Sequence, residues 1–275
     1  MYYLLGIQEV IKPILTLSKP YLKANEKITP ENLQLAFRKY LIKNQYLKEN
    51  SDESPFILTA ENKIENYLKV LEVETLLKPK ANISLSRYIK YLNEFIETQE
   101  STLVSIFKVV VHKVIFTKNA KHSGCASSQK AIGVIWIQPE NHWTKQDLYE
   151  AIIHEMTHTI INIDELVYGH YKDKNLIQRD KTTWVNSAIR DEKRPLDAVL
   201  HSILVSIEIY LFRKNRSGYS DEFTLHPSTE QLVIQTSNSL KEIKILGLEK
   251  IKLRMEDILL SVEKWASNSE YEVNL

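Results

Sequence analysis

The sequence is poor in cysteine and glycine, and neither acidic nor basic residues are in clear excess. A single cysteine, Cys125, excludes an internal disulfide and a zinc site built from cysteines. The 36 lysine and arginine residues against 35 aspartate and glutamate give a net charge of +1, so the chain lacks the basic excess of a broad nucleic-acid-binding surface. With only six glycines and eight prolines, turns are few and a mostly helical chain is expected.

Long apolar runs are also missing. The most apolar stretch, VLHSILVSIEIYLF, is interrupted by His201 and Glu208 and is too short to cross a membrane. The first 17 residues include Glu9 and Lys12 and have neither a basic start nor a small-residue cleavage site, so we expect no signal peptide. The sequence therefore predicts a cytoplasmic protein that binds neither membranes nor nucleic acid.

The apolar periodicity predicts a mainly α-helical fold with a small β element. Helices are expected over residues 29–47, 55–77, 84–99, 144–166 and 195–214, and one broken helix or two successive helices over 227–266 with the break at Gly247. The Val- and Ile-rich segments 107–116 and 131–139 predict two strands separated by a turn over residues 118–130, and the polar segment 167–193 predicts a loop. We expect residues 1–100 to form a helical N-terminal part and residues 101–275 a metal-binding catalytic part, unless the two form one continuous domain.

Two of the expected helices begin at capping residues. Thr29 is a predicted N-cap, followed by Pro30 at the first helical position. Thr144 and Asp147 predict a capping box in which a carboxylate replaces the usual Glu or Gln. These caps fix where the first and fourth of the expected helices begin.

The stretch AIIHEMTHTII carries the strongest functional signal. On a helix, His154 and His158 lie one turn apart on the same face, so both imidazoles can reach one metal ion. The four flanking isoleucines indicate a buried helix, where two imidazoles without partners would be costly. We therefore predict metal binding, against the alternative that the HExxH pattern arose by chance.

A metal held by two histidines needs a third protein ligand, and the common signatures for it are absent. The metzincin pattern requires a histidine at position 164, which is Asp164, and a glycine at position 161, which is Ile161. A thermolysin-like site requires a glutamate about two dozen residues further on, where Gln178 and Asp180 occur. Glu192 is an alternative third ligand, but it lies in a predicted loop, so the signature of neither class of peptidase is matched.

His201 is the stronger candidate for the third ligand, which would place the metal site between two core helices. It lies on an otherwise apolar helix, with Asp197 one turn earlier. Asp197 or a backbone carbonyl would then orient the ring of His201. The alternative is a core histidine whose ring bonds to Asp197. The remaining histidines are expected to face water; these are His112, His122, His142, His170 and His226.

A cluster of cations comes just before the helix that carries His201. Arg190, Lys193 and Arg194 lie next to a predicted helix N-terminus, which attracts anions, and arginine binds carboxylates with two hydrogen bonds. The cluster therefore suggests a site for a small dicarboxylate. The alternative is a solvated charge run paired with Asp191 and Glu192.

Together, the histidine helix and the later cationic stretch resemble the HExxH-type family of peptide-modifying proteins found with ribosomally made, post-translationally modified peptides. Members carry a segment similar to S-P-W-R-x-x-P-R-P-x-x-G-x-x-H. The positions that match it here are Ser187, Arg190, Arg194, Pro195 and His201. The positions that depart from it are Ala188, Ile189, Lys193 and Ala198. The resemblance covers residues 130–212, including the strand AIGVIWIQP.

The resemblance implies a non-haem iron(II), 2-oxoglutarate-dependent oxygenase that hydroxylates a side chain, at its β-carbon, of a ribosomally made precursor peptide. It implies His154, His158 and His201 as metal ligands, which leaves positions on iron for 2-oxoglutarate and O₂. Arg190 and Arg194 are the matching arginines for the distal carboxylate of 2-oxoglutarate, and Arg194 is nearer the helix start. The partner would be the precursor peptide, and residues 1–100 are a candidate for holding it.

Glu155 distinguishes this expectation from two alternatives. In an oxygenase no general base is required, and Glu155 would orient a ligand or a bound water. In a zinc metallopeptidase, Glu155 would be the catalytic general base that activates zinc-bound water. A third reading is a peptide-binding protein without activity, in which four ligands would close a structural metal site.

Overall fold

The computed structural model describes most of the chain and confirms a mainly α-helical protein with a small sheet. The described residues are 1–25, 27–48, 56–59, 61–76, 84–189, 192–216, 225–246 and 248–273. Two compact units divide the chain: one combines Met1–Val10 with Asp164–Leu275, and the other is Ile11–Ile163. The predicted functional division near residue 100 remains a prediction.

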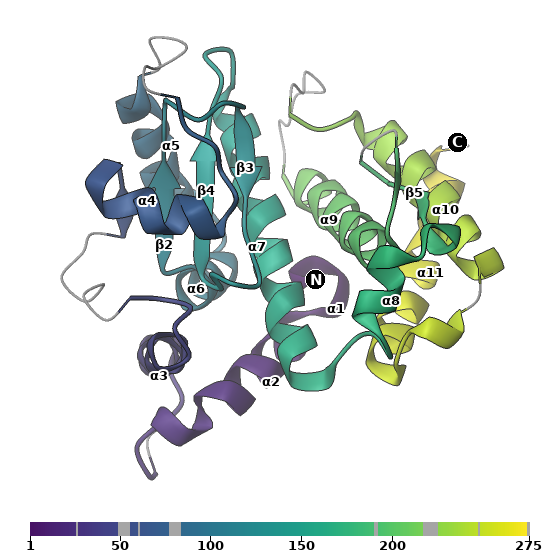
Figure 1. Ribbon diagram of the computed structural model, residues 1–275, viewed down its shortest axis with the longest axis horizontal. Helices are drawn as coiled ribbons and strands as arrows, with labels where there is room; N and C mark the ends of the chain where they lie inside the picture. Colours follow the sequence, from purple (N-terminus) through teal and green to yellow (C-terminus); the bar gives the residue numbers. More distant parts are fainter. Residues whose placement is uncertain are drawn as a thin grey trace. The chain divides into compact units, whose positions relative to one another are not determined.

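The Ile11–Ile163 unit contains the sheet and the histidine helix (Figure 1). Its helices are α3 (Pro30–Lys43), α4 (Glu61–Val70), α5 (Leu85–Thr98), α6 (Ser101–Val110), most of α2 (Ile7–Ser18) and most of α7 (Lys145–Tyr168), with a 3-10 turn at Lys19–Tyr21. Its strands are β1 (Ile57–Leu58), β2 (Lys113–Phe116), β3 (Gly124–Ala126) and β4 (Val134–Gln138). Helices predicted over 29–47, 84–99 and 144–166 are thus confirmed.

The sheet has the strand order β1-β2-β4-β3. The first three strands are parallel, and β3 joins β4 antiparallel, with Cys125 opposite Ile137. Every residue of β2 and β4 is buried, as expected for central strands covered on both faces, whereas the residues of β3 are partly exposed. β3 is therefore one of the two edge strands of this sheet among the described residues, and β1 is the other.

Two predictions in this unit were wrong in part. The segment 107–116 was expected to be one strand, but α6 continues to Val110 and only Lys113–Phe116 pairs in the sheet. The valines at this helix end are almost fully buried, and burial overrides their intrinsic preference for strands. Likewise, part of the helix predicted over 55–77 is strand β1, because Ile57 and Leu58 pair with β2.

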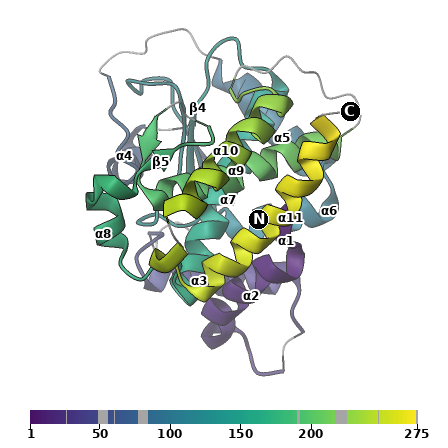
Figure 2. The same ribbon diagram turned by 90° about the vertical axis from the view of Figure 1, so that its right-hand side faces the viewer.

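The other unit is mostly helical, and its helices α9 and α10 lie side by side (Figure 2). Its elements are α1 (Tyr2–Leu5), α8 (Lys174–Arg179), β5 (Val185–Asn186), β6 (Lys193–Arg194), α9 (Leu196–Lys214), α10 (Thr229–Leu246) and α11 (Leu253–Val273), with 3-10 turns at Lys181–Thr183 and Leu248–Lys250. The helix predicted over 195–214 is confirmed. The segment 227–266 forms two helices, and the predicted break at Gly247 lies outside the described residues. The loop predicted over 167–193 was wrong in part, because it contains α8 and β5.

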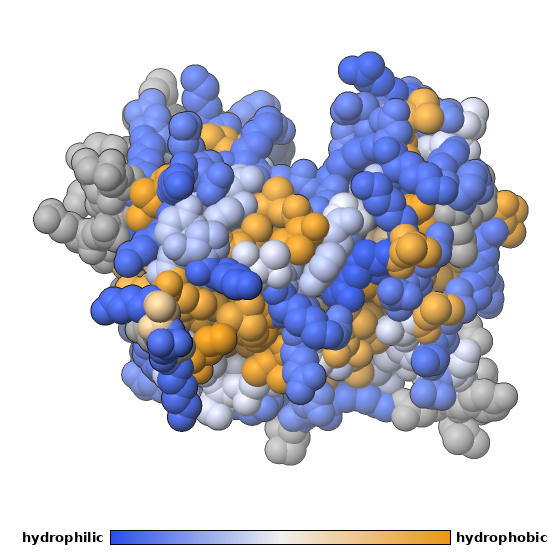
Figure 3. Space-filling view, turned by 90° about the horizontal axis from the view of Figure 1, so that it is seen from below, coloured by the Kyte–Doolittle hydropathy of each residue, from blue (hydrophilic) through white to orange (hydrophobic). Residues whose placement is uncertain are grey.

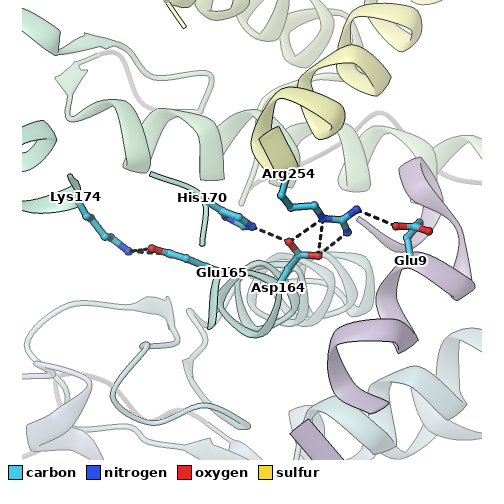
Figure 4. Close-up of polar contacts among 6 residues, drawn as sticks. All are labelled: Glu9, Asp164, Glu165, His170, Lys174 and Arg254. Atoms are coloured by element: carbon cyan, nitrogen blue, oxygen red, sulfur yellow. Dashed lines mark hydrogen bonds and ion pairs between the residues drawn. The ribbon is translucent and has the colours of Figure 1, made fainter. Parts of the chain in front are cut away.

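Buried ionic contacts hold this unit together. The Glu208 carboxylate of α9 accepts hydrogen bonds from the backbone N–H groups of Tyr3 and Leu4, both 3.0 Å long, which satisfies amides at the start of α1. In the same unit, the Asp164 carboxylate contacts the His170 ring and the Arg254 guanidinium (Figure 4). Charges this deeply buried are tolerated only when they are paired.

On the face shown in Figure 3, apolar and polar residues are interspersed. Among the described residues, Ile245 and Leu253 are the most exposed large apolar side chains, with 85% and 77% of their surface accessible. No described helix combines the length and the apolar character that a membrane crossing demands.

Candidate functional site

Helix α7 begins at the predicted capping box. The Thr144 N–H donates to Asp147 Oδ2 at 2.8 Å, and the Asp147 N–H donates to Thr144 Oγ1 at 3.2 Å. Two helix-terminal amides are thereby satisfied reciprocally, with a carboxylate in the role of the usual Glu or Gln. The box fixes the start of the helix, and hence which face carries the two histidines.

The two histidines occupy the open positions of an otherwise buried helix. From Asp147 to Asp164, every residue of α7 is buried except His154 and His158, which are half-buried. The two threonine hydroxyls in this segment bond within the helix: Thr157 donates to the Ile153 carbonyl at 2.7 Å, and Thr159 donates to the Glu155 carbonyl at 2.8 Å. Side chains one turn apart share a face, so both imidazoles lie on the same side of α7.

The geometry of the histidine pair fits two ligands of one metal ion. His154 Nε2 and His158 Nε2 are 3.2 Å apart, and the ring centroids are 4.9 Å apart. Two nitrogens each about 2.1 Å from one ion, at angles between about 90° and 109°, lie roughly 3.0–3.4 Å apart. The pair is therefore spaced for a tetrahedral or an octahedral ion with little movement of either ring.

Glu155 lies directly beside this pair and is buried, with 2% of its surface accessible. Its Oε1 is 3.8 Å from His154 Nε2, and its Oε2 has no hydrogen bond of ordinary geometry among the described residues. Burial raises the pKa of Glu155 to about 7, against the opposing influence of Ser127 and Cys125, which stabilise the charged form. Near neutral pH this carboxyl can therefore both accept and donate a proton.

Sequence reasoning missed strand β3. Residues 118–130 were expected to be a turn, but Gly124–Ala126 forms this strand. Cys125 of β3 and Ser127 just beyond it lower the pKa of Glu155 against the effect of burial. The segment is rich in turn-forming residues, which gave no signal of a strand.

His201 lies on α9, in the unit formed by Met1–Val10 and Asp164–Leu275. His154 and His158 belong to the Ile11–Ile163 unit. Between Leu196 and Tyr210, only Ala198 and His201 are not fully buried, so one side of α9 is open at these two residues. The alternative of a core histidine bonded to Asp197 is wrong. Asp197 Oδ2 accepts from Gln178 Nε2 at 2.9 Å, and Asp197 Oδ1 has no partner among the described residues.

The described part of the chain contains no group of three or more His, Cys, Asp or Glu side chains arranged to hold a metal ion. The metal site predicted between two core helices is therefore not shown. What the structure provides is a pair of nitrogens at metal-ligand spacing, with a buried carboxyl next to it.

The cationic cluster is described only in part. Arg190 lies outside the described residues. Arg194 is in β6, opposite Val185, and its Nε is 3.7 Å from Glu192 Oε1. The Arg194 side chain keeps 34% of its surface accessible. The pairing with Glu192 also fits the alternative of a charge run with its own counterions.

Three of the histidines expected to face water are buried, and these predictions were wrong. His170 is fully buried, with its Nε2 2.7 Å from Asp164 Oδ1. His226 is 6% exposed. His112 is 2% exposed, and burial lowers its pKa to about 3, so it is a neutral core residue. His122 and His142 are exposed, as predicted.

Comparison with known proteins adds no assignment. No family model matches the chain, and no curated protein is similar enough to count as a relative.

Proposed function

We propose that this protein is a non-haem iron(II), 2-oxoglutarate-dependent oxygenase that hydroxylates a side chain of a ribosomally made precursor peptide, at the β-carbon. The observation that carries the proposal is the pair His154 and His158, whose Nε2 atoms are 3.2 Å apart at the open positions of a buried helix. The choice of an oxygenase and of a peptide substrate rests on the resemblance of residues 130–212 to the peptide-modifying family.

In this proposal His154 and His158 hold the iron, and His201 is the third ligand on the strength of the sequence match. Iron with bound 2-oxoglutarate and O₂ supplies the oxidising power to hydroxylate an unactivated carbon. Arg194, partly exposed and next to the start of α9, binds the distal carboxylate of 2-oxoglutarate, and Arg190 is the second matching arginine. Arginine suits this role because its planar fork donates two parallel hydrogen bonds to a carboxylate.

A zinc metallopeptidase is the second candidate, and the position of Glu155 favours it. A general base needs a pKa near the working pH, and burial raises the pKa of Glu155 to about 7. The carboxyl is 3.8 Å from a proposed metal-binding nitrogen, with one oxygen that has no hydrogen bond of ordinary geometry among the described residues. In the peptidase this oxygen would take a proton from zinc-bound water.

Spectroscopy of the full chain separates the two candidates. Iron(II) and then 2-oxoglutarate are added without oxygen to metal-free protein, and the visible spectrum is recorded. We expect a charge-transfer band that needs both additions, disappears in His154→Ala and weakens in Arg194→Ala. The matched control is His142→Ala, which removes an exposed histidine from the same unit and should leave the band unchanged.

The opposite outcome would promote the peptidase. It consists of no band, zinc retained through dialysis, and cleavage of casein-derived peptides that stops in Glu155→Gln. Iron and zinc both bind imidazole, so metal content alone does not distinguish the oxygenase from the peptidase. The 2-oxoglutarate-dependent band and peptide cleavage distinguish them.

A further inference from the structure

Strand β5 lies beside helix α10, and its residue Asn186 turns its polar groups towards that helix (Figure 1). In the β5–β6 hairpin, Asn186 lies opposite Lys193. At the next position, the Ser187 N–H donates to the Glu192 carbonyl at 3.0 Å, so the backbone of residue 187 faces β6. Successive residues of an antiparallel strand alternate in this respect, so the N–H and C=O groups of Asn186 point away from β6.

Two side chains of α10 bind these backbone groups and the side-chain amide of Asn186. Glu242 Oε2 accepts from the Asn186 N–H at 3.0 Å, and Glu242 Oε1 accepts from Asn186 Nδ2 at 2.5 Å. The Ser239 hydroxyl donates to the Asn186 carbonyl at 2.8 Å. Ser239 and Glu242 are three residues apart and therefore share one face of the helix. On this edge of the hairpin, α10 takes the place that a third strand would have.

The hairpin that α10 holds carries Arg194. Arg194 lies in β6 directly opposite Val185, the residue before Asn186, and α9 begins two positions further on. Just beyond β5, the Ala188 N–H donates to the Ser202 hydroxyl of α9 at 3.2 Å. The backbone of Arg194 is thus fixed on one side by α9 and on the other by the strand that α10 binds.

Fixing this backbone matters for binding an anion. An arginine binds a carboxylate with two parallel hydrogen bonds only when its guanidinium has a defined position and angle. A group that is already in place loses less freedom when the ligand binds, so a held arginine gives a higher affinity than a mobile one. The side chains of α10 can therefore influence an anion that they do not touch.

We propose that Glu242 is a positioning residue: through Asn186 it holds the β5–β6 hairpin, so that Arg194 meets the distal carboxylate of 2-oxoglutarate in one orientation. The inference rests on the proposed function, because it takes Arg194 as the residue that binds 2-oxoglutarate. It adds to that function a residue of α10, in a segment outside the resemblance of residues 130–212.

The direction of the effect separates positioning from simple electrostatics. Glu242 is acidic, and removing a negative charge from the neighbourhood of an anion site favours the anion. An electrostatic role therefore predicts that 2-oxoglutarate binds more tightly to Glu242→Ala. Positioning predicts the opposite, because the variant loses the two hydrogen bonds that hold Asn186.

The first test asks whether Glu242 holds the hairpin, and it uses the full chain without metal. Hydrogen exchange of the amides of residues 185–189, measured by mass spectrometry, should speed about tenfold in Glu242→Ala. The matched control is Glu230→Ala, which removes an exposed carboxylate from the first turn of the same helix and should leave this exchange unchanged. Equal exchange in wild type and Glu242→Ala would overturn the proposal.

The second test measures 2-oxoglutarate affinity from the charge-transfer band of the iron(II) protein without oxygen. Glu242→Ala should raise the dissociation constant about tenfold and leave iron(II) affinity unchanged. Glu242→Gln keeps one acceptor oxygen and should recover part of the loss, and Glu230→Ala should bind like wild type. Binding as tight as in wild type, or tighter, in Glu242→Ala would overturn the positioning role. So would an equal loss of iron(II) affinity, which indicates general disruption of the fold.

A double variant tests whether Glu242 acts through Asn186. Asn186→Ala removes the side-chain amide and keeps the backbone N–H, so it should weaken 2-oxoglutarate less than Glu242→Ala does. Adding it to Glu242→Ala should cause no further loss, because both changes break the same contact, whereas additive losses would contradict the proposal. If wild type shows no band, the proposed function fails and this inference falls with it. If wild type shows the band and Glu242→Ala binds equally well, only the inference falls.

Discussion

The ionic contacts around Asp164 allow a stability prediction with a defined size. Arg254 Nε donates to both Asp164 oxygens at 3.0 and 3.1 Å, and Arg254 Nη2 donates to Oδ2 at 2.6 Å. Arg254 Nη1 is 2.8 Å from Glu9 Oε2, and the His170 ring is 2.7 Å from Asp164 Oδ1 (Figure 4). The side chains of Asp164 and His170 are 1% and 0% exposed, so the aspartate has almost no access to solvent.

Replacing Arg254 with methionine keeps much of the side-chain volume and removes the guanidinium. Asp164 would then be a buried carboxylate with only His170 as a partner. Removing one partner of a buried ion pair typically costs about 3–5 kcal/mol of stability. Because the Arg254 side chain is 17% exposed and water can partly replace it, we expect about 3 kcal/mol.

The assay is urea unfolding at pH 7 with linear extrapolation of the free energy of unfolding. The matched control is Lys244→Met, which breaks the exposed Lys244–Glu263 ion pair of 3.0 Å in the same unit and should cost less than about 1 kcal/mol. The double variant Asp164→Asn with Arg254→Met should lose less than the sum of the single variants, because no buried charge is left unpaired. If Arg254→Met costs no more than Lys244→Met, the reasoning is refuted.

Three further predictions concern the same chain. Burial alone would raise the pKa of Asp164, but hydrogen bonds from His170 and Arg254 outweigh it and lower the pKa below its ordinary value of 3.8. The stabilisation from these contacts is therefore present above about pH 4 and is lost as the pH falls through the lowered pKa. In urea unfolding midpoints measured from pH 6 to pH 2, Asp164→Asn should flatten this loss. Thr144→Ala should cost about 1 kcal/mol in the same unfolding assay, because it removes the cap of α7. Gly133→Ala should cost about 1–3 kcal/mol by thermal unfolding, since φ is +84° there and a Cβ would lie 3.1 Å from the His112 ring; an unchanged Tm would contradict this.

The sequence alone was sufficient to predict features that depend on residues close together in the chain. The spacing of His154 and His158 placed both rings on one face of a helix, and the capping box at Thr144 and Asp147 formed as predicted. Both features depend on residues three or four positions apart in one helix, whose geometry is nearly invariant. Neighbouring chain segments are not needed to specify them.

Where burial controls a segment, sequence reasoning failed. The end of α6 at Val109 and Val110 is helical because the core surrounds it, not because valine favours helices. His170 follows the end of α7 in what reads as a polar loop, yet it is fully buried against Asp164. Asp164 also contacts Arg254, which lies 90 residues further along the chain, and nothing in the local pattern of either segment indicates this contact.

The surroundings of Glu155 combine the two cases. Its position next to His154 follows from the motif, but its burial, which raises its pKa, depends on tertiary packing that the sequence did not reveal. Strand β3 is three residues long and exists because it pairs with the fully buried β4. Cys125 of this strand and Ser127 just beyond it stabilise the charged form of Glu155 and so lower its pKa against the effect of burial. A short polar strand that pairs beside an HExxH helix is therefore where the partners of the motif glutamate should be sought.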